Sequence, residues 1–218
     1  MSINLLATFY SFAYILIIVG IAFLLYRYTG IGSEGVRKFI HILVSGWVFI
    51  LVGMYDSLPW ALLGPSVFIV INAVFVYSGF SKYLGMGNRK RDNGLIYYPF
   101  SILVLIILLY EGVIDDRVVV ASTLMMGFGD GCAALIGSRF GHHGYTSLGG
   151  KKSIEGTLTM FVVSITILLL IYPDRPWYVP LSVAFLATVL ENLTPLGFDN
   201  ITVPLLSAVA LGVLNGIY

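Results

Sequence analysis

Charged residues are scarce in this 218-residue chain, in which Asp, Glu, Lys and Arg together make up only 11% of the sequence. Soluble domains usually contain about 25%. Hydrophobic residues make up 58%, and the mean hydropathy is +0.94. This composition excludes an ordinary water-soluble domain. The net charge of +1 gives no sign of a nucleic-acid partner.

Cysteine is almost absent, because Cys132 is the single cysteine and lies in an apolar run. One cysteine excludes a disulfide within the chain and a cysteine-based metal site. The N-terminal apolar run from Ile3 to Tyr26 has no basic residues before it and no clear cleavage site. We therefore expect it to be the first membrane helix and not a cleavable signal peptide.

Long apolar runs, in contrast, are abundant. A bilayer core of about 30 Å requires roughly 20 apolar residues in a helix. The segments that approach this length predict an all-α, polytopic transmembrane bundle of about eight helices in a single catalytic domain, residues 1–218. Because two segments are short and the third contains Pro59 and Pro65, seven spans plus a re-entrant segment is the alternative. The predicted spans are 3–26, 39–55, 58–78, 95–111, 118–138, 156–172, 177–195 and 200–218.

Positive charge is concentrated on one side of this predicted bundle. Only Arg117 and Arg175 fall in the second, fourth and sixth loops. Short loops rich in Lys and Arg stay in the cytoplasm, so we expect the odd-numbered loops to be cytoplasmic and both termini to lie on the other side. The basic residues of the odd-numbered loops are Arg27, Arg37, Lys38, Lys82, Arg89, Lys90, Arg91, Arg139, Lys151 and Lys152.

Asp130 lies deep in the fifth apolar segment, among glycines. About nine residues separate it from Arg139, which places it roughly 13 Å inside the helix end. An ionisable group at such a depth costs on the order of 3 kcal/mol, so we expect it to face a polar cavity or a cation. Gly129 and Gly131 let a ligand or metal approach closely. The alternative for the glycines is close helix packing through Gly127 and Gly131.

Two glycines, two lysines and a serine follow one another at positions 149–153 in the fifth loop. Flexible backbone lets amides turn toward an anion, and Lys151 and Lys152 supply positive charge, so the loop is a candidate phosphate site. The spacing is not that of a Walker A loop. The alternative is a solvated basic loop that only sets the membrane topology. Ser153 and Glu155 are also candidates to cap the next helix.

Arg37, Lys38 and His41 open the second apolar segment. Arg37 and His41 are four residues apart and share a face of the predicted helix. They are candidates for a ligand site on the cytoplasmic side. The alternative is that Arg37 and Lys38 anchor the helix at the membrane surface while His41 is a satisfied interior residue.

Glu191 lies near the end of the seventh segment, and Asp199 and Asn200 lie just before the eighth. Asp199 or Asn200 is also a candidate N-cap of the last helix. In the eight-span arrangement these residues, Asp130 and the basic motifs all approach the cytoplasmic side. Lysines neutralise phosphates and carboxylates hold Mg²⁺, so this convergence suits a metal–nucleotide complex.

At these motifs the chain resembles the CTP-dependent lipid kinases, a family that includes dolichol kinase, phytol kinase and the CTP-using diacylglycerol kinase. The order and spacing of four motifs carry the resemblance, which extends from about residue 35 to residue 205. The stretch 94–99 leans toward the phytol kinase branch. The four motifs are Arg37-Lys38-x-x-His41, Gly129-Asp130-x-x-Ala133-Ala134-x-x-Gly137, Lys151-Lys152-Ser153-x-Glu155-Gly156, and Glu191 through Asp199-Asn200.

The resemblance implies transfer of the γ-phosphate of CTP to the hydroxyl of a membrane isoprenoid alcohol, such as phytol, geranylgeraniol or dolichol, with Mg²⁺. Membrane lipids surround the enzyme, and its site lies at the cytoplasmic face. We assign catalytic roles to Asp130, Glu191 and Asp199 and metal binding to Asp130, Glu155 and Glu191. His41 and Asn200 are assigned to the lipid substrate. The nucleotide-binding set is Arg37, Lys38, Gly129, Gly131, Lys151, Lys152 and Ser153.

Two other function classes remain open from the sequence. One is a related lipid enzyme, either a CTP-dependent diacylglycerol kinase or a phosphatidate cytidylyltransferase-like enzyme. The other is an ion- or proton-coupled transporter in which Asp130 binds the ion at mid-membrane. The sequence does not fix which lipid alcohol is used, and it leaves the oligomeric state open.

Overall fold

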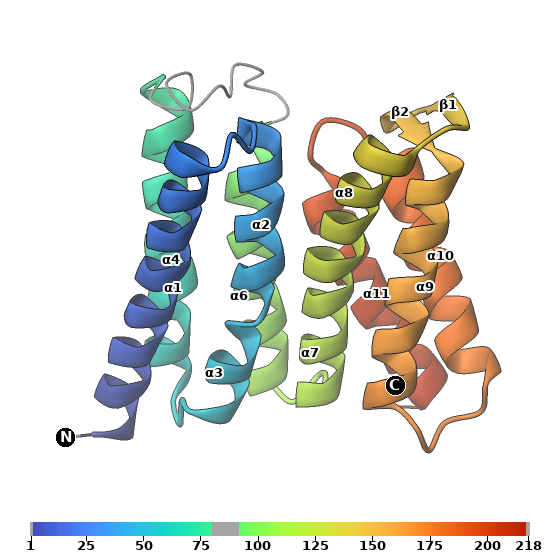
Figure 1. Ribbon diagram of the computed structural model, residues 1–218. Coiled ribbons are helices and arrows are strands. Elements are labelled where there is room, and N and C mark those ends of the chain that lie inside the picture. The colour runs from blue at the N-terminus through green and yellow to red at the C-terminus, as the bar shows by residue number, and fades with distance from the viewer. Residues whose placement is uncertain (1, 80–91, 217–218) are drawn as a thin grey trace.

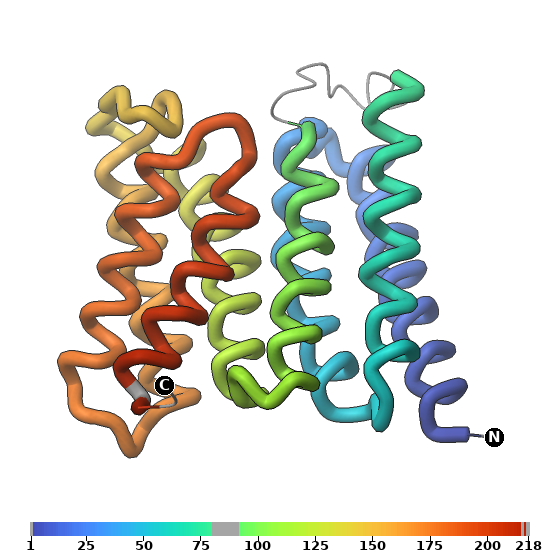
Figure 2. The backbone as a smooth tube through the Cα atoms, turned by 180° about the vertical axis from the view of Figure 1, so that it is seen from behind, coloured from blue at the N-terminus to red at the C-terminus, as the bar shows by residue number. Residues whose placement is uncertain are grey.

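Eight helical passes form two rows in residues 2–79 and 92–216, the part of the chain that the computed structural model describes (Figure 1). One row contains α1, α2–α3, α7–α8 and α9, and the other contains α4, α6, α11 and α10, as Figure 2 shows from behind. The elements are α1 Ile3–Tyr28, α2 Ser33–Ser45, α3 Val48–Gly53, α4 Leu58–Tyr77, α6 Gly94–Tyr110, α7 Asp116–Leu124, η2 Met125–Asp130, α8 Gly131–Phe140, β1 Gly144–Ser147, β2 Gly150–Ser153, α9 Ile154–Ile171, α10 Tyr178–Leu193 and α11 Asp199–Asn215.

The predicted all-α membrane bundle is confirmed. Within the described residues, five helical segments are long and apolar enough to cross a membrane, and three more are shorter apolar helices. Each predicted span corresponds to one of these helices. The largest boundary difference is in the second span, which begins at Ser33, so that Arg37 and Lys38 lie inside the helix instead of before it.

A β-hairpin replaces the flexible glycine-rich loop that the sequence predicts between the fifth and sixth spans. Strands β1 and β2 are antiparallel, with Gly144 opposite Ser153 and Ser147 opposite Gly150. Gly150 has a φ of 116°, which a residue with a side chain rarely adopts, and this lets the chain reverse tightly. The hairpin stands at the upper end of the bundle in Figure 1.

Side-chain caps fix two of the helix starts. Asp115 accepts a hydrogen bond from the backbone N–H of Val118 at 2.8 Å, and Ser153 accepts one from Gly156 at 3.1 Å. The predicted capping by Ser153 is therefore confirmed. The predicted capping of the last helix is wrong, because its N-cap is Phe198 and Asp199 is already the first helical residue.

A half-buried amide joins α4 to α6. Pro99 has no N–H group, so the carbonyl of Leu95, four residues earlier, loses its normal helical donor. Asn72 of α4 donates a hydrogen bond to that carbonyl at 2.7 Å. The polar residue inside an apolar helix thus satisfies a backbone group that the proline leaves exposed to the low-dielectric interior.

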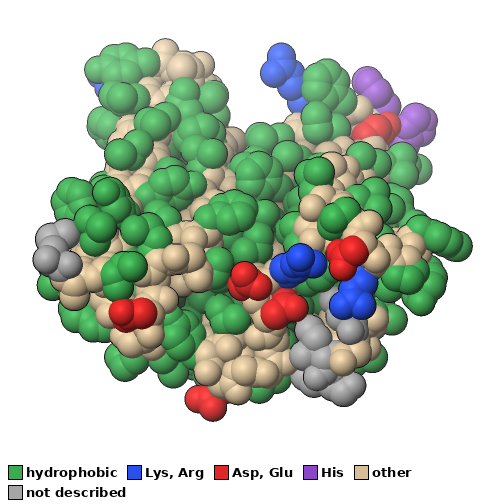
Figure 3. Space-filling model, turned by 90° about the horizontal axis from the view of Figure 1, so that it is seen from below, with side chains coloured by type: hydrophobic (Ala, Val, Ile, Leu, Met, Phe, Trp, Pro, Cys, Tyr) green, Lys and Arg blue, Asp and Glu red, His purple; other side chains and the backbone are tan. Residues whose placement is uncertain are grey.

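The two ends of the bundle differ in charge. The first, fifth and seventh connections lie at the upper end in Figure 1, together with Arg37, Lys38 and the hairpin lysines. The basic residues Lys82, Arg89, Lys90 and Arg91 of the third loop lie outside the described residues. The opposite end, seen in Figure 3, is mostly hydrophobic or uncharged, and among its charged side chains acidic ones predominate. Its connections and helix ends carry Asp56, Glu111, Asp115, Asp116 and Asp174, with Arg117 and Arg175.

Candidate active site

Asp130 is buried near the upper end of the bundle and contacts two side chains of α2. Its Oδ2 atom lies 2.5 Å from the Nζ of Lys38 and 3.7 Å from the Nε2 of His41. All three side chains are at most 14% exposed. The ring of Tyr98, from α6, packs against the His41 ring with 4.4 Å between the centroids. The deep carboxylate thus faces a cation, the Lys38 ammonium group, as the sequence predicts, and not lipid.

A π-helical segment, η2, places Asp130 in this position. It spans Met125–Asp130 between α7 and α8, and Asp130 is its last residue. Such segments contain extra residues relative to the α-helix, so they rotate the following turn, and they are frequent at functional sites. The apolar periodicity of the fifth span gave no sign of this segment.

The glycines around Asp130 bring the neighbouring helices into close contact. A side chain at Gly127 or Gly131 would overlap Ser45 or Ile42, both on α2, and one at Gly129 would lie 2.6 Å from the Met160 sulfur on α9. These contacts agree with the packing alternative for the glycines. Nucleotide binding by Gly129 and Gly131 stays a prediction.

The hairpin supplies a second ion pair. Lys152 of β2 contacts the Glu191 carboxylate near the end of α10, and its Nζ also donates to the Glu191 carbonyl at 3.3 Å. Glu191 is buried. Lys151 is exposed, because successive side chains of a strand point to opposite faces. The structure therefore separates two lysines that the sequence treats as one motif.

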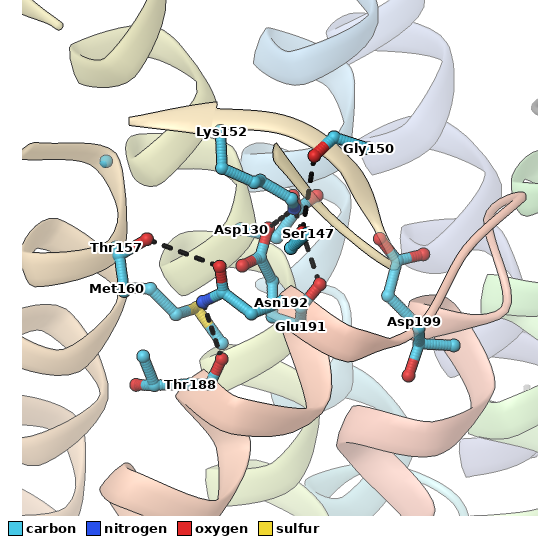
Figure 4. A network of polar contacts seen from close by, with 12 residues as sticks. Asp130, Ser147, Gly150, Lys152, Thr157, Met160, Thr188, Glu191, Asn192 and Asp199 are labelled. Carbon is cyan, nitrogen blue, oxygen red and sulfur yellow. Dashed lines mark hydrogen bonds and ion pairs between the residues drawn. The ribbon is translucent and has the colours of Figure 1, made fainter. Parts of the chain in front are cut away.

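Asn192 fastens the hairpin to α10. Its side-chain oxygen contacts the hydroxyl of Tyr145, and lies 3.4 Å from the Thr157 hydroxyl of α9. Its side-chain nitrogen donates to the Thr188 carbonyl at 2.9 Å, while its backbone carbonyl accepts from Gly149 at 2.9 Å. Because Tyr145 is directly opposite Lys152 in the hairpin, this network fixes the position of the lysine (Figure 4).

The charges of the site act on one another. Burial lowers the pKa of Lys152, but the Glu191 carboxylate, with further contributions from Asp130 and Asp199, raises it, and the net pKa lies above its usual value. Lys152 is therefore protonated at neutral pH. Two ammonium groups, on Lys38 and Lys152, and three carboxylates form one electrostatic cluster drawn from α2, η2, β2, α10 and α11.

Asp199 enters the cluster from the first turn of α11, and its carboxylate points toward the hairpin (Figure 4). Its Oδ1 atom accepts 2.9 Å hydrogen bonds from the backbone and side chain of Asn200, and it forms no ion pair within the described residues. The preceding turn is unusual, since Leu196 has a φ of 63° and Gly197 a φ of 82°. Asn200 also donates to the Gly197 carbonyl at 3.1 Å.

Other predicted residues lie at the margin of the cluster. The Glu155 carboxylate contacts His143 Nδ1 at 2.7 Å and accepts from the backbone of His142 and His143, so it holds the start of the hairpin. Arg37 pairs with Glu34 at 2.6 Å. Metal binding by Glu155 and nucleotide binding by Arg37, Lys151 and Ser153 stay predictions.

Sequence reasoning missed three residues of the site. Tyr98 lies beside His41, and Tyr145 and Asn192 position the hairpin. Asn192 follows Glu191 directly, and a polar pair at the end of an apolar helix was a usable signal. For Tyr98 and Tyr145, composition gave no signal, because tyrosine is common at membrane boundaries for other reasons.

The carboxylates suit Mg²⁺ held together with a nucleotide. In the described part of the chain, no three His, Cys, Asp or Glu side chains form a preassembled metal cage. Mg²⁺ does not require one, because it usually binds through one or two carboxylates, water and phosphate oxygens. The buried Asp130 and Glu191 and the half-buried Asp199 provide hard oxygen donors in one cluster. The donor set therefore fits this ion.

Comparison with known proteins identifies the family. The chain is 33% identical to a phytol kinase from Synechocystis sp. over 183 residues, which cover 81% of this chain and 77% of that protein. The chain belongs to the phytol kinase family. A probable chloroplastic phytol kinase from Triticum aestivum is 30% identical over 144 residues, covering 58% of this chain and 47% of the plant protein. No family profile and no solved structure matches.

Membership of the phytol kinase family confirms the predicted resemblance to lipid kinases. It agrees with the membrane bundle, and it supports a kinase over a transporter. The comparison extends over most of the chain, and it therefore covers most of the elements that supply the charged cluster.

Proposed function

We propose that this chain transfers the γ-phosphate of CTP to the hydroxyl group of a membrane isoprenoid alcohol, with phytol, geranylgeraniol and dolichol-type polyprenols as the substrate class. Family membership supports a lipid-alcohol kinase. The charged cluster at one end of an apolar bundle supports the location of the reaction. A lipid hydroxyl rests near the head-group level, and a nucleotide reaches the same level from water.

Lys38 and Lys152 hold the nucleotide phosphates in this proposal. The Lys38 ammonium group is buried beside Asp130 and the half-buried Lys152 ammonium group contacts Glu191, so each is already positioned before a ligand binds. Phosphate oxygens are better counter-ions for two lysines than two separate carboxylates, because one ligand then satisfies both. Mg²⁺, when bound, neutralises phosphate charge and orients the transferring group. Asp130 and Glu191 are the residues that hold it.

Asp199 accepts the proton of the lipid hydroxyl. Among the described residues it is the acid of the cluster without a lysine contact, so its carboxylate is available to a substrate. The alcohol oxygen forms a bond to the γ-phosphorus while the bond to the bridging β–γ oxygen breaks. The products are CDP and a lipid monophosphate, and the hydroxyl proton moves to Asp199. His41 and Asn200 lie at positions from which they orient the hydroxyl.

The site faces the cytoplasm in this proposal. The end of the bundle that contains it carries Arg27, Arg37, Lys38, Arg139 and the hairpin lysines, whereas Arg117 and Arg175 are at the opposite end. Short basic connections stay on the cytoplasmic side. Both termini then lie on the other side of the membrane.

The observation that carries the proposal is that the Lys38–Asp130 and Lys152–Glu191 pairs belong to one electrostatic cluster in a phytol kinase family member. Helix packing does not require two lysines and three acids in an apolar bundle. A transporter function would not require a lysine at this position of the hairpin. A lipid kinase that uses a nucleotide as donor needs cations to hold the phosphates and carboxylates to hold Mg²⁺.

The test is incubation of the purified protein with γ-labelled CTP and a panel of phytol, geranylgeraniol, a polyprenol and diacylglycerol, followed by lipid extraction. We expect label in an isoprenoid monophosphate and release of CDP. Label in phosphatidate would assign the diacylglycerol kinase activity, and CDP-lipid with pyrophosphate would assign a cytidylyltransferase. Parallel reactions with γ-labelled ATP and GTP test the choice of nucleotide.

A variant pair tests the phosphate role of the hairpin. Lys152→Met should raise the apparent KM for CTP by about tenfold or more, because a charge-assisted phosphate contact contributes roughly 1.5–3 kcal/mol. Arg117→Met, at the opposite end of the bundle, is the matched control and should leave that KM unchanged. An unchanged KM in Lys152→Met would remove the hairpin from nucleotide binding.

A further inference from the structure

Tyr97 of α6 and Phe198, which directly precedes α11, form an aromatic pair where these two helices meet. The rings of Tyr97 and Phe198 are stacked, with 4.7 Å between centroids and 26° between planes. Phe198 is the N-cap residue of α11 and is 42% exposed. The pair therefore forms a flat apolar surface that faces outward from the bundle.

Each member of the pair directly precedes a residue of the candidate site in the sequence. Tyr97 precedes Tyr98, whose ring packs on His41 beside Asp130. Phe198 precedes Asp199, the acid without an ion pair in the described residues. The aromatic pair is thus next in sequence to site residues on two elements, α6 and the first turn of α11.

The exposed face continues from Phe198 along α11. Leu206, Val209 and Val213 are 44%, 49% and 60% exposed, and their spacing of three and four residues places them on one face of α11. Phe198 precedes Leu206 by about two helical turns, so it lies toward the same side. From Phe198 to Val213 the helix rises roughly 22 Å. This stripe leads from the charged cluster toward the opposite end of the bundle.

The turn before Phe198 is held in a strained conformation. Leu196 has a φ of 63°, which is uncommon for a residue with a side chain. Such strain is concentrated at functional sites and ligand clamps. On the α6 side, a side chain at Gly94 would lie only 3.0 Å from the Asn200 amide nitrogen, so the turn and α6 are in close contact. The position of Phe198 is thus fixed by its surroundings.

We propose that Tyr97 and Phe198 form the point at which the isoprenoid chain of the substrate leaves the site, and that the exposed face of α11 is the surface along which this chain lies in the bilayer. This inference rests on the proposed function. The hydroxyl remains at the charged cluster while the methyl-branched chain packs on the aromatic pair and on the stripe of Leu206, Val209 and Val213. Chain length, and not the alcohol group, is what this surface recognises.

A chain-length series tests the proposal with CTP at saturation. Geraniol, farnesol and geranylgeraniol carry the same allylic alcohol on chains of increasing length. Phe198→Ala should lower kcat/KM for geranylgeraniol by about tenfold or more, and for geraniol by less than about twofold, because lost apolar contacts discriminate by that order. Phe185→Ala is the matched control, since Phe185 is an aromatic residue of α10 that is 64% exposed.

The outcomes separate three readings. Wild-type protein that phosphorylates none of the alcohols overturns the proposed kinase function itself. An equal loss for all chain lengths, or the same loss in Phe185→Ala, shows that Phe198 is an interfacial anchor only and overturns the α11 surface. A photoreactive geranylgeraniol analogue provides a readout that does not depend on turnover. Its label should map to Tyr97 and to residues 198–213, and label spread over helices other than α6 and α11 contradicts the proposal.

Discussion

The Lys38–Asp130 pair allows the sharpest test of the site. Its atoms are 2.5 Å apart, and the two side chains are 11% and 8% exposed. Removing one partner of a buried pair destabilises a protein by about 3–5 kcal/mol, because it leaves an uncompensated charge. His41 and the residual exposure reduce this penalty, so we expect Asp130→Asn and Lys38→Met each to lower the free energy of unfolding by about 3 kcal/mol.

The double variant separates stability from chemistry. With both charges removed, no uncompensated charge remains, so the double variant should lie within about 1 kcal/mol of the wild type. The coupling energy between the two sites is then about 5 kcal/mol. Kinase activity should not recover, because both groups also act on the substrates. Each single variant and the double variant should lose about 100-fold or more in kcat/KM.

Unfolding by SDS in detergent micelles, followed by tryptophan fluorescence, measures the stability, and transfer from γ-labelled CTP measures the activity. The exposed pair Arg117–Asp174, 3.5 Å apart at the opposite end, is the control, and it should contribute less than about 1 kcal/mol. Additive stability losses at Lys38 and Asp130 would refute the ion pair. Recovery of activity in the double variant would show that the pair has a structural role alone.

Three further predictions address the hairpin and the packing. Asn192→Ala should raise the KM for CTP about fivefold or more, because it removes the hydrogen bonds that hold the hairpin in place. The KM for the lipid alcohol, measured in a separate titration, should not change. Gly131→Ala should lower the free energy of unfolding by about 1–3 kcal/mol through overlap with α2, whereas Gly20→Ala, which has open space, should not lower it. Asn72→Leu should destabilise by about 1–3 kcal/mol, and Pro99→Ala should reduce that loss by restoring a helical donor; an undiminished loss would contradict the assigned bond.

Much of the site was readable from the sequence. Lys38, Asp130, Lys152, Glu191 and Asp199 were all singled out from their residue types and positions, and the structure gathers them in one cluster. The sequence did not indicate that Lys151 faces away from it. The different directions of Lys151 and Lys152 depend on the strand register of the hairpin. The glycine-rich composition of this segment had predicted a flexible loop instead.

The amino-acid sequence by itself determined that this protein lies in a membrane, and it also determined the approximate extent of its helices and the unequal charge of its two ends. These are local properties, because hydropathy and helical periodicity depend on neighbouring residues. Only the tertiary structure decided which lysine meets which acid, where η2 rotates Asp130 toward α2, and that Asn192 and Tyr145 hold the hairpin. Such contacts join residues far apart in the chain, such as 38 with 130, and depend on distances of a few ångströms that no local pattern encodes.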